Sequence, residues 1–485
     1  MKTDLKRRAD TRSRAPKSDN FAKYMTTSWA DSAPVEPVFI PEKSFTEVRR
    51  EKLSKMFLGD RLIIEAGDLK TRSNDVDYRF RPNSAFAYFT GLGVDLEPGA
   101  VLVFNPIVIK QKGIPPHNTH TCTLYIDSMK DRSSTEFYES STHGEFWIGK
   151  RLSLEQFEQL TGITTKDKTA LKSDLKNKIF WPHKVRVISD SKNDDRLLET
   201  ASEMRLVKDK YEIEQMRKAI IATKTGFERV IRNLTRAKNS ARGERIVEGE
   251  FYANALESGN SVGYETIAAA GEHATTLHWI QNTGAVRENE LLLLDAGVEV
   301  DSLYTADITR TMPISGEFNK WQRDIYDLVL LAADEAFKVA TPGKKFRDVH
   351  DRAMEVIAEG LSRLGILGVD PKVALREDQQ QHRRWMCHGT SHHLGIDVHD
   401  CAHAREQNYR DAELKPGMIF TIEPGLYFKN DDLLVPAQYR GIGVRIEDDI
   451  LITDDGAENL SVSIPRSPEH LTSWMKQLMN EEGNA

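Results

Sequence analysis

Five residues of the kind that bind metal ions lie in or beside apolar runs in the second half of the chain. Asp295 ends the run Leu-Leu-Leu-Leu, and Asp307 alternates with threonines. His392 lies in the sequence His-Gly-Thr-Ser-His-His, while Glu423 and Glu447 follow Phe-Thr-Ile and Val-Arg-Ile. Burying four carboxylates and one imidazole is costly unless positive charge compensates them. Two divalent cations would provide that charge, and hard oxygen ligands with a single nitrogen suit Mn, Co or Zn.

Each of these residues also has an ordinary structural explanation. An aspartate at a strand end, such as Asp295, commonly forms a cap or a turn, and Asp307 could lie on a solvated strand face. Glu423 precedes a Pro-Gly turn, and Glu447 begins a Glu-Asp-Asp cluster that would be ordinary on a surface. The histidine loop could be a surface loop without a task. Only the joint occurrence of all five, in this order, favours a metal site.

The composition limits the classes of function. With 485 residues, 39% of them hydrophobic, the chain can form two or more domains with a sizeable core. Its net charge of −7 gives no general attraction to nucleic acid or to an anionic membrane. The cysteines, Cys122, Cys387 and Cys401, include no Cys-x-x-Cys pair, which argues against a disulfide framework and a zinc knuckle. Cys387 precedes His388, but neighbours on a strand point to opposite faces, which disfavours a nucleophilic pair.

Hydropathy and the N-terminal segment bear on location. No segment approaches the run of about 20 apolar residues that crosses a membrane. The N-terminus is polar and basic and lacks the apolar region of a secretory signal. We therefore predict that residues 1–40 form a disordered basic tail, with a nucleic-acid-binding arm as the alternative. We expect a cytoplasmic protein that has neither a membrane nor a nucleic acid as its partner.

Residues 41–202 are predicted to form an α/β domain, because helix-like and strand-like segments alternate. Ser44–Leu58 has the pattern of an amphipathic helix, and an aromatic cluster over Ser84–Gly91 ends with glycine. The polar stretch Lys110–His120 is predicted as a loop. Strands are predicted at residues 61–66, 99–104, 121–126 and 185–189.

Residues 203–485 are predicted to form a second domain of helices and strand pairs. Apolar residues at helical spacing predict helices from Ile213 onward, over Trp321–Ala340 and after the turn at Thr341. Two strand pairs are predicted, one between residues 291–300 and 305–313 and the other between 417–428 and 441–453. Each pair contributes two of the four acids named above.

In this order, the five motifs resemble those of the pita-bread metallopeptidases, a family that includes methionine aminopeptidase, prolidase and aminopeptidase P. The segment Arg72–Gly91, Arg-Ser-Asn-Asp-Val-Asp-Tyr-Arg-Phe-Arg-Pro-Asn-Ser-Ala-Phe-Ala-Tyr-Phe-Thr-Gly, makes the resemblance to aminopeptidase P the strongest. The resemblance covers residues 203–460 and part of the N-terminal half. It implies an α/β (α+β) fold: an N-terminal α/β domain of the creatinase/aminopeptidase P type, followed by a C-terminal pita-bread catalytic domain.

The resemblance also implies roles for individual residues. The metal ligands would be Asp295, Asp307, His392, Glu423 and Glu447. Of these, Asp307 and Glu447 would bridge two metal ions. The residues implied in catalysis and substrate binding are Glu423 as a proton shuttle, the pocket histidines His278, His388 and His399, and the substrate-binding candidates Tyr264, Tyr427, Arg445 and Asp75.

The implied activity is that of a metal-dependent Xaa-Pro aminopeptidase. Such an enzyme releases the N-terminal residue from peptides with proline in second position, by means of a hydroxide that bridges two metal ions. Mn²⁺ is the expected metal, with Co²⁺ or Zn²⁺ as alternatives, and a homodimer or homotetramer is the expected assembly.

Three other functions use related folds. Prolidase has the same ligands but cleaves only Xaa-Pro dipeptides, and the sequence alone does not separate it from aminopeptidase P. A metal-free enzyme such as creatinase, or a non-catalytic binding module as in histone chaperones, would require lost ligands. All five ligand positions are intact, which argues against these last two functions.

Overall fold

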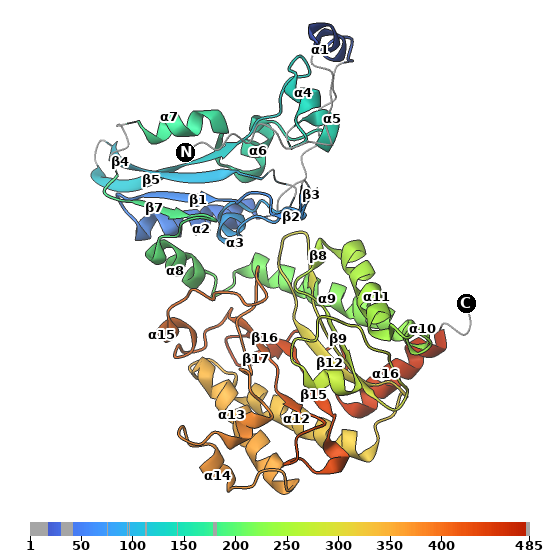
Figure 1. Ribbon diagram of the computed structural model, residues 1–485. Coiled ribbons are helices and arrows are strands. Elements are labelled where there is room, and N and C mark those ends of the chain that lie inside the picture. The colour runs from blue at the N-terminus through green and yellow to red at the C-terminus, as the bar shows by residue number, and fades with distance from the viewer. Residues whose placement is uncertain are drawn as a thin grey trace, which may run out of the picture. The chain divides into compact units, whose positions relative to one another are not determined.

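The computed structural model describes residues 18–30, 42–74, 76–94, 96, 98–111, 114–142, 144–177 and 182–481. The chain divides into two compact units, Met1–Leu198 and Glu199–Ala485, which Figure 1 colours from blue to green and from green to red. Helix α8 (Asp195–Met204) runs through this division. The predicted domain boundary after residue 202 lies in the same helix and stays a prediction.

A five-stranded mixed sheet lies at the centre of the N-terminal unit, in the order β6-β5-β4-β1-β7. Its strands are β1 (Arg61–Glu65), β4 (Val101–Gln111), β5 (Ile114–Ile126), β6 (Thr164–Asp167) and β7 (Val185–Ile188). Strand β1 pairs antiparallel with β4 and parallel with β7. Leu62, Ile64 and Leu102 are fully buried, because alternate residues of a strand point to the same covered face. The four predicted strands are confirmed, and β6 is an additional one.

Helices cover both faces of this sheet, with α2 (Lys43–Met56) and α3 (Ser84–Thr90) on one face and α6 (Leu154–Thr161) and α7 (Leu171–Leu175) on the other (Figure 1). The predicted helix α2 is confirmed. The aromatic cluster forms α3, which ends because Gly91 adopts a left-handed conformation with φ of 74°. The unit also contains β2 (Thr71–Ser73), β3 (Val76–Asp77), α4 (Glu136–Glu139) and α5 (Glu145–Ile148).

The prediction of a loop over Lys110–His120 is wrong. Strand β4 continues to Gln111, β5 begins at Ile114, and Ile109 lies opposite His117 in the register. Antiparallel pairing uses backbone hydrogen bonds, so the hairpin can extend beyond the apolar run that the sequence reveals. At the base of this extension, Nε2 of His120 lies 2.7 Å from the carbonyl oxygen of Asp60.

A short helix, α1 (Asp19–Met25), lies within the segment that was expected to be a disordered tail. The rings of Phe21 and Trp29 pack edge-on against those of Tyr138 and Phe137, with centroid distances of 5.7 and 5.4 Å. These aromatic contacts account for the order of residues 18–30. The rest of the predicted tail lies outside the described residues.

Three long helices of the C-terminal unit follow the predicted apolar spacing: α9 (Lys210–Arg232), α12 (Lys320–Val339) and α13 (Phe346–Arg363). Asp209 and Asn319 begin α9 and α12 with capping boxes, which satisfy backbone N–H groups that have no partner inside the helix. Helices α12 and α13 pack side by side (Figure 1). The three predicted helices are confirmed.

Short antiparallel ladders between these helices form both predicted strand pairs. Strand β10 (Leu291–Ala296) pairs with β12 (Ile308–Pro313) and with β9 (Ile267–Ala270). In the second pair, β13 (Ile419–Ile422) pairs with β16 (Asp448–Ile452), and β14 (Gly425–Tyr427) pairs with β15 (Gly443–Arg445). Glu423 and Glu447 lie where these ladders break, so neither belongs to a named strand.

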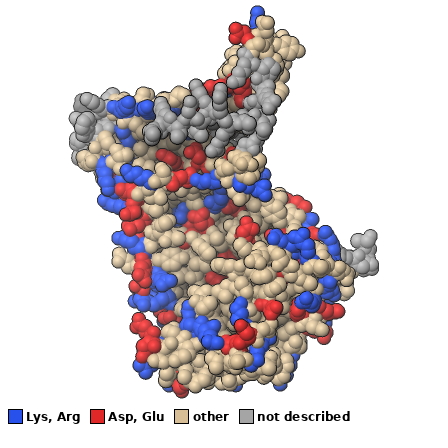
Figure 2. Space-filling model, in the orientation of Figure 1, with Lys and Arg blue, Asp and Glu red and all other residues tan. Residues whose placement is uncertain are grey.

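The remaining elements of this unit are α10 (Leu234–Lys238), α11 (Gly243–Ser258), β8 (Ser261–Val262), β11 (Val298–Glu299), α14 (Pro371–Ala374), α15 (Glu406–Tyr409), β17 (Ala457–Asn459) and α16 (Pro468–Glu481). On the face shown in Figure 2, basic and acidic side chains are interspersed over this unit. Among the described residues, no helix combines the length and the apolar character that crossing a bilayer requires.

Candidate metal centre and substrate pocket

The predicted metal ligands line one cavity of about 500 Å³ in the C-terminal unit. Asp295 lies on β10, and Asp307 directly precedes β12. Glu423 and Glu447 lie at the breaks in the second strand pair, and His392 lies in the loop that leads to it. The ladders bring together side chains that are up to 152 residues apart in sequence, because the register places Asp295 and the break at Glu447 on either side of β12.

The ligand atoms face a common space. Nε2 of His392 lies 3.2 Å from Oδ2 of Asp307 and 3.5 Å from Oε1 of Glu423. One ligand atom each from Asp307, His392 and Glu447 lies within 4.8 Å of the other two. Thr309 holds Glu447 in place, since its hydroxyl donates to Oε2 of Glu447 at 2.7 Å.

A buried arginine supports this cluster from behind. Nη2 of Arg445 donates to Oδ2 of Asp295, and Nη1 donates to the hydroxyl of Tyr427 at 3.0 Å. Nε donates to the hydroxyl of Thr309 at 3.1 Å. Arg445 therefore fixes the orientation of Asp295 and joins both strand pairs, as residues that orient metal ligands do.

Tyr264 marks a polar position that the protein alone does not fully satisfy. Its hydroxyl lies 2.6 Å from Oδ1 of Asp295 and also within hydrogen-bond distance of Oδ1 of Asp307. A phenol has one hydrogen, so it donates to only one of the two carboxylates. The other carboxylate oxygen keeps a lone pair that a cation would use.

The charges of the cluster fit a cation. Burial raises the pKa of Glu423 to about 7, and burial together with the charge of Asp307 raises that of Glu447 well above its usual value. Burial lowers the pKa of His392, but its hydrogen bond with Asp307 and the charge of Glu423 outweigh burial and raise it to about 9. Two cationic side chains thus face four carboxylates, and the carboxylates repel one another. A divalent ion would relieve this repulsion, and the donor set of oxygens with one nitrogen suits one.

The three predicted pocket histidines line the same cavity. Nε2 of His388 lies 2.7 Å from the hydroxyl of Tyr427, and burial together with the charge of Arg445 lowers the pKa of His388 to about 3. The ring of His399 stands edge-on to that of His392 at a centroid distance of 4.5 Å. Burial lowers the pKa of His399 as well. His388 and His399 are therefore neutral imidazoles that can each donate one hydrogen bond.

The structure thus brings together nearly all the predicted site residues. The cavity is lined by Tyr264, His278, Asp295, Asp307, His388, His392, His399, Glu423, Arg445 and Glu447, and Tyr427 contacts two of them. Asp75, the remaining substrate-binding candidate, lies outside the described residues.

Several supporting residues were not predicted. Asp449 is fully buried, and its Oδ2 accepts from the backbone N–H of Asp307 at 3.3 Å. Arg310 is also fully buried and donates to Oδ1 of Asp448 and to the carbonyl of Glu447, each at 2.7 Å. The Glu-Asp-Asp sequence could have indicated Asp448 and Asp449, but it is equally typical of a solvated acidic cluster on a surface.

Comparison with known proteins assigns the chain to a family. The model of metallopeptidase family M24 matches residues 214–454, and that of the aminopeptidase P N-terminal domain matches residues 46–185. Xaa-Pro aminopeptidase 1 of Streptomyces coelicolor is 44% identical over 472 residues, which cover 95% of this chain and 93% of the relative. The chain belongs to the aminopeptidase P family. Within this family, the Xaa-Pro aminopeptidase of Escherichia coli is 32% identical over 472 residues, covering 90% of this chain and 98% of that protein.

Solved structures support the same assignment. Aminopeptidase P from E. coli with the inhibitor Pro-Leu has a TM-score of 0.76 and 31% identity, covering 92% of this chain and all of that one. The predicted resemblance and the predicted fold class are therefore confirmed. Membership of an aminopeptidase P family within the M24 metallopeptidases implies a divalent metal site.

Proposed function

We propose that this protein is a metal-dependent Xaa-Pro aminopeptidase, which removes the first residue from peptides with proline in second position. The observation that carries the proposal is the convergence of four carboxylates and one imidazole on a single cavity. This convergence occurs in a chain that is 44% identical to a Xaa-Pro aminopeptidase along nearly its whole length.

The residues that would hold two divalent ions are Asp295, Asp307, His392, Glu423 and Glu447. The ions would polarise the scissile carbonyl and lower the pKa of a bound water. Mn²⁺ is the metal we propose, with Co²⁺ or Zn²⁺ as alternatives. One solved relative is a Zn-substituted E. coli aminopeptidase P in complex with product, which supports Zn²⁺ as a metal that such a site accepts.

Side chains of the cavity supply the proton transfers. Glu423 would take a proton from the attacking water and pass it to the leaving nitrogen of proline. His399, as a neutral imidazole, would donate a hydrogen bond to the oxyanion that forms on the scissile carbonyl. Arg445 acts indirectly, because its hydrogen bonds orient Asp295 and Tyr427.

The chemistry of the scissile bond explains why ordinary peptidases do not cleave before proline. The proline nitrogen carries no hydrogen, so an enzyme that recognises an amide N–H cannot bind this bond in the usual way. A prolidase must in addition recognise the free carboxylate of the proline, whereas an aminopeptidase P must leave that end open. The names of the relatives favour aminopeptidase P.

Hydrolysis of peptides of two lengths tests the assignment. We expect an Xaa-Pro-Xaa tripeptide to be cleaved at least as efficiently as an Xaa-Pro dipeptide, and an Xaa-Ala-Xaa tripeptide to be cleaved poorly. Strict restriction to the dipeptide would assign the protein to prolidase, and equal cleavage of the alanine peptide would refute specificity for proline.

We further propose a homodimer or homotetramer in the cytoplasm. The assembly is common in the family that the sequence resembles, so this proposal rests on analogy. The cytoplasmic location is supported by the cysteines, since Cys122, Cys387 and Cys401 are free thiols. Fractionation of cells that express the full chain would test the location.

A further inference from the structure

One buried carboxylate holds the base of the segment that carries His278 to the cavity, residues 271–284. Glu244, in the first turn of α11, has no exposed surface. Its Oε1 accepts hydrogen bonds from Ala270 N at 2.8 Å and His273 Nδ1 at 2.7 Å, and its Oε2 accepts them from Trp279 Nε1 at 2.9 Å and Gly284 N at 2.5 Å. A carboxylate only accepts, so Nδ1 of His273 carries the hydrogen.

Close contacts surround Glu244. The ring of His273 stacks on that of Trp279 at a centroid distance of 3.9 Å. A Cβ atom at Gly284 would lie 2.7 Å from the His273 ring and 2.8 Å from Oε2 of Glu244. The backbone N–H of Glu244 also donates to the carbonyl of Gly284 at 3.1 Å. Both ends of the segment are therefore fixed to the same helical turn.

The tip of the segment is more exposed than its base. Leu277, His278 and Ile280 line the active cavity, yet His278 is exposed and Ile280 is 47% exposed. Buried Asn282 is a second anchor, since its Oδ1 accepts from the N–H of Ala268 at 3.0 Å. Lys429 donates to the hydroxyl of Thr276 at 3.0 Å, and together with the base of the segment this bond sets the position of His278.

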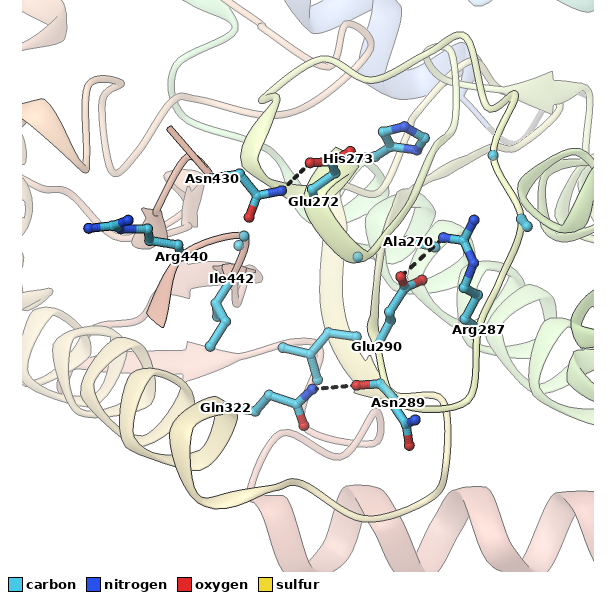
Figure 3. A pocket seen from close by; sticks show the side chains of 16 residues that line it. Ala270, Glu272, His273, Arg287, Asn289, Glu290, Gln322, Asn430, Arg440 and Ile442 are labelled. Atoms are coloured by element: carbon cyan, nitrogen blue, oxygen red, sulfur yellow. Dashed lines mark hydrogen bonds and ion pairs between the residues drawn. The ribbon is translucent and has the colours of Figure 1, made fainter. Parts of the chain in front are cut away.

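The other side of the segment borders open space. A second cavity of about 450 Å³ lies there, and Figure 3 shows that two of its lining residues, Glu272 and Asn430, are joined by a hydrogen bond. The hydrogen bonds from His273 to Glu244 and from Asn430 to Glu272 hold this part of the segment.

We propose that Glu244 is a positioning residue for the aminopeptidase reaction, because it fixes the segment from which His278 faces the substrate. The inference rests on the proposed function, which assigns His278 to the substrate pocket. Glu244→Gln keeps the shape of the side chain but places an NH₂ group against two of the four N–H donors. Unpaired buried donors would then push the segment out of place, and a displacement of about 1 Å can reduce a rate about 100-fold.

A double-mutant cycle tests this role. kcat and KM for an Xaa-Pro-Xaa tripeptide would be measured for the wild-type, Glu244→Gln, His278→Ala and doubly substituted enzymes, each loaded with Mn²⁺. We expect Glu244→Gln to lower kcat/KM about 10-fold to 100-fold. This loss should be divided between a lower kcat and a higher KM in the same ratio as the loss in His278→Ala. In the His278→Ala background, Glu244→Gln should change kcat/KM less than about twofold. The control Glu257→Gln removes an exposed charge from the same helix and should behave as wild type.

Three outcomes would overturn the proposal: unchanged kcat/KM in Glu244→Gln, the same loss with and without His278, or loss of bound metal. Should Glu244→Gln fail to fold, Trp279→Phe removes one donor and keeps the stacking ring, and the same cycle applies with a smaller loss. If the wild-type enzyme cleaves no Xaa-Pro peptide, the proposed function itself is refuted. The wild-type measurement, which is the first of the cycle, distinguishes this outcome.

Discussion

At the scale of single residues, Asp307 joins several parts of the proposed metal site. Its side chain contacts His392 and Tyr264, and its backbone N–H is held by Asp449. Asp307→Asn keeps the shape of the side chain but removes its negative charge from the group of residues that would hold the metal. We expect the loss of most of the activity, on the order of 100-fold or more, with an unchanged circular dichroism spectrum. Asp301→Asn, which neutralises an exposed aspartate in the preceding turn, should keep full activity.

A substitution at His399 tests whether this residue stabilises the oxyanion or binds metal. Because its proposed role is to donate one hydrogen bond, His399→Ala should lower kcat on the order of 10²-fold to 10³-fold and leave the metal content unchanged. Kinetics together with metal analysis by mass spectrometry check this result. The exposed His403, in the same loop, provides the control His403→Ala. A missing ion in His399→Ala would show that His399 is a ligand.

Sequence reasoning found the ligand-type residues but not their support. Asp295, Asp307, Glu423 and Glu447 stood out because each follows or interrupts an apolar run. Thr309, Arg310 and Asp449 gave no such signal, since a threonine, an arginine or one acid in an acidic run is usually solvated. Their roles arise from contacts across more than 130 residues of sequence. Only the folded register reveals such contacts.

At the scale of elements, helix α13 holds the histidine loop through the partly buried imidazole of His350. Nδ1 of His350 lies 2.7 Å from the hydroxyl of Thr390, and Nη1 of Arg383 donates to Nε2 at 2.7 Å. Burial, aided by the charges of Arg383, His382 and Arg410, lowers the pKa of His350 to about 4. The folded protein therefore keeps this imidazole neutral at pH values where the unfolded chain protonates it.

A loss of stability at mildly acidic pH follows from His350. As the pH falls from about 6.5 to about 4, the unfolded state binds a proton that the folded state does not, which costs on the order of 3 kcal/mol. Thermal unfolding measured at pH 7, 5.5 and 4.5 should show a steeper fall for wild type than for His350→Gln. The exposed His470 gives the control His470→Gln, which should follow wild type. Parallel curves for wild type and His350→Gln would contradict this account.

A helix or strand could be predicted from the sequence where its periodic pattern of apolar residues begins and ends at the same residues as the element itself. Helix α9 meets this condition with one buried apolar face, and strands β10 and β13 meet it because apolar residues fill most of their buried positions. The hairpin of β4 and β5 does not, since its pairing continues into a polar stretch that reads as a loop. Helix α1 was missed because its order comes from aromatic residues over 100 positions away.

At the scale of the whole molecule, the proposed assembly gives a direct prediction. Sedimentation velocity at micromolar concentration should show a dimer or tetramer of the 55.0 kDa chain. The measurement should be made with and without Mn²⁺, because we expect the assembly to be independent of the metal. A monomer under both conditions would refute the proposal and would leave the assignment of the active site unaffected.

Metal-dependent cleavage before proline is the central claim, and one measurement tests it most directly. The release of the first residue from an Xaa-Pro-Xaa tripeptide would be followed with protein that has been stripped by a chelator, before and after addition of Mn²⁺. We predict no measurable release by the stripped protein and restored release after the addition. Full activity of the stripped protein, with metal analysis showing no bound ion, would contradict the account.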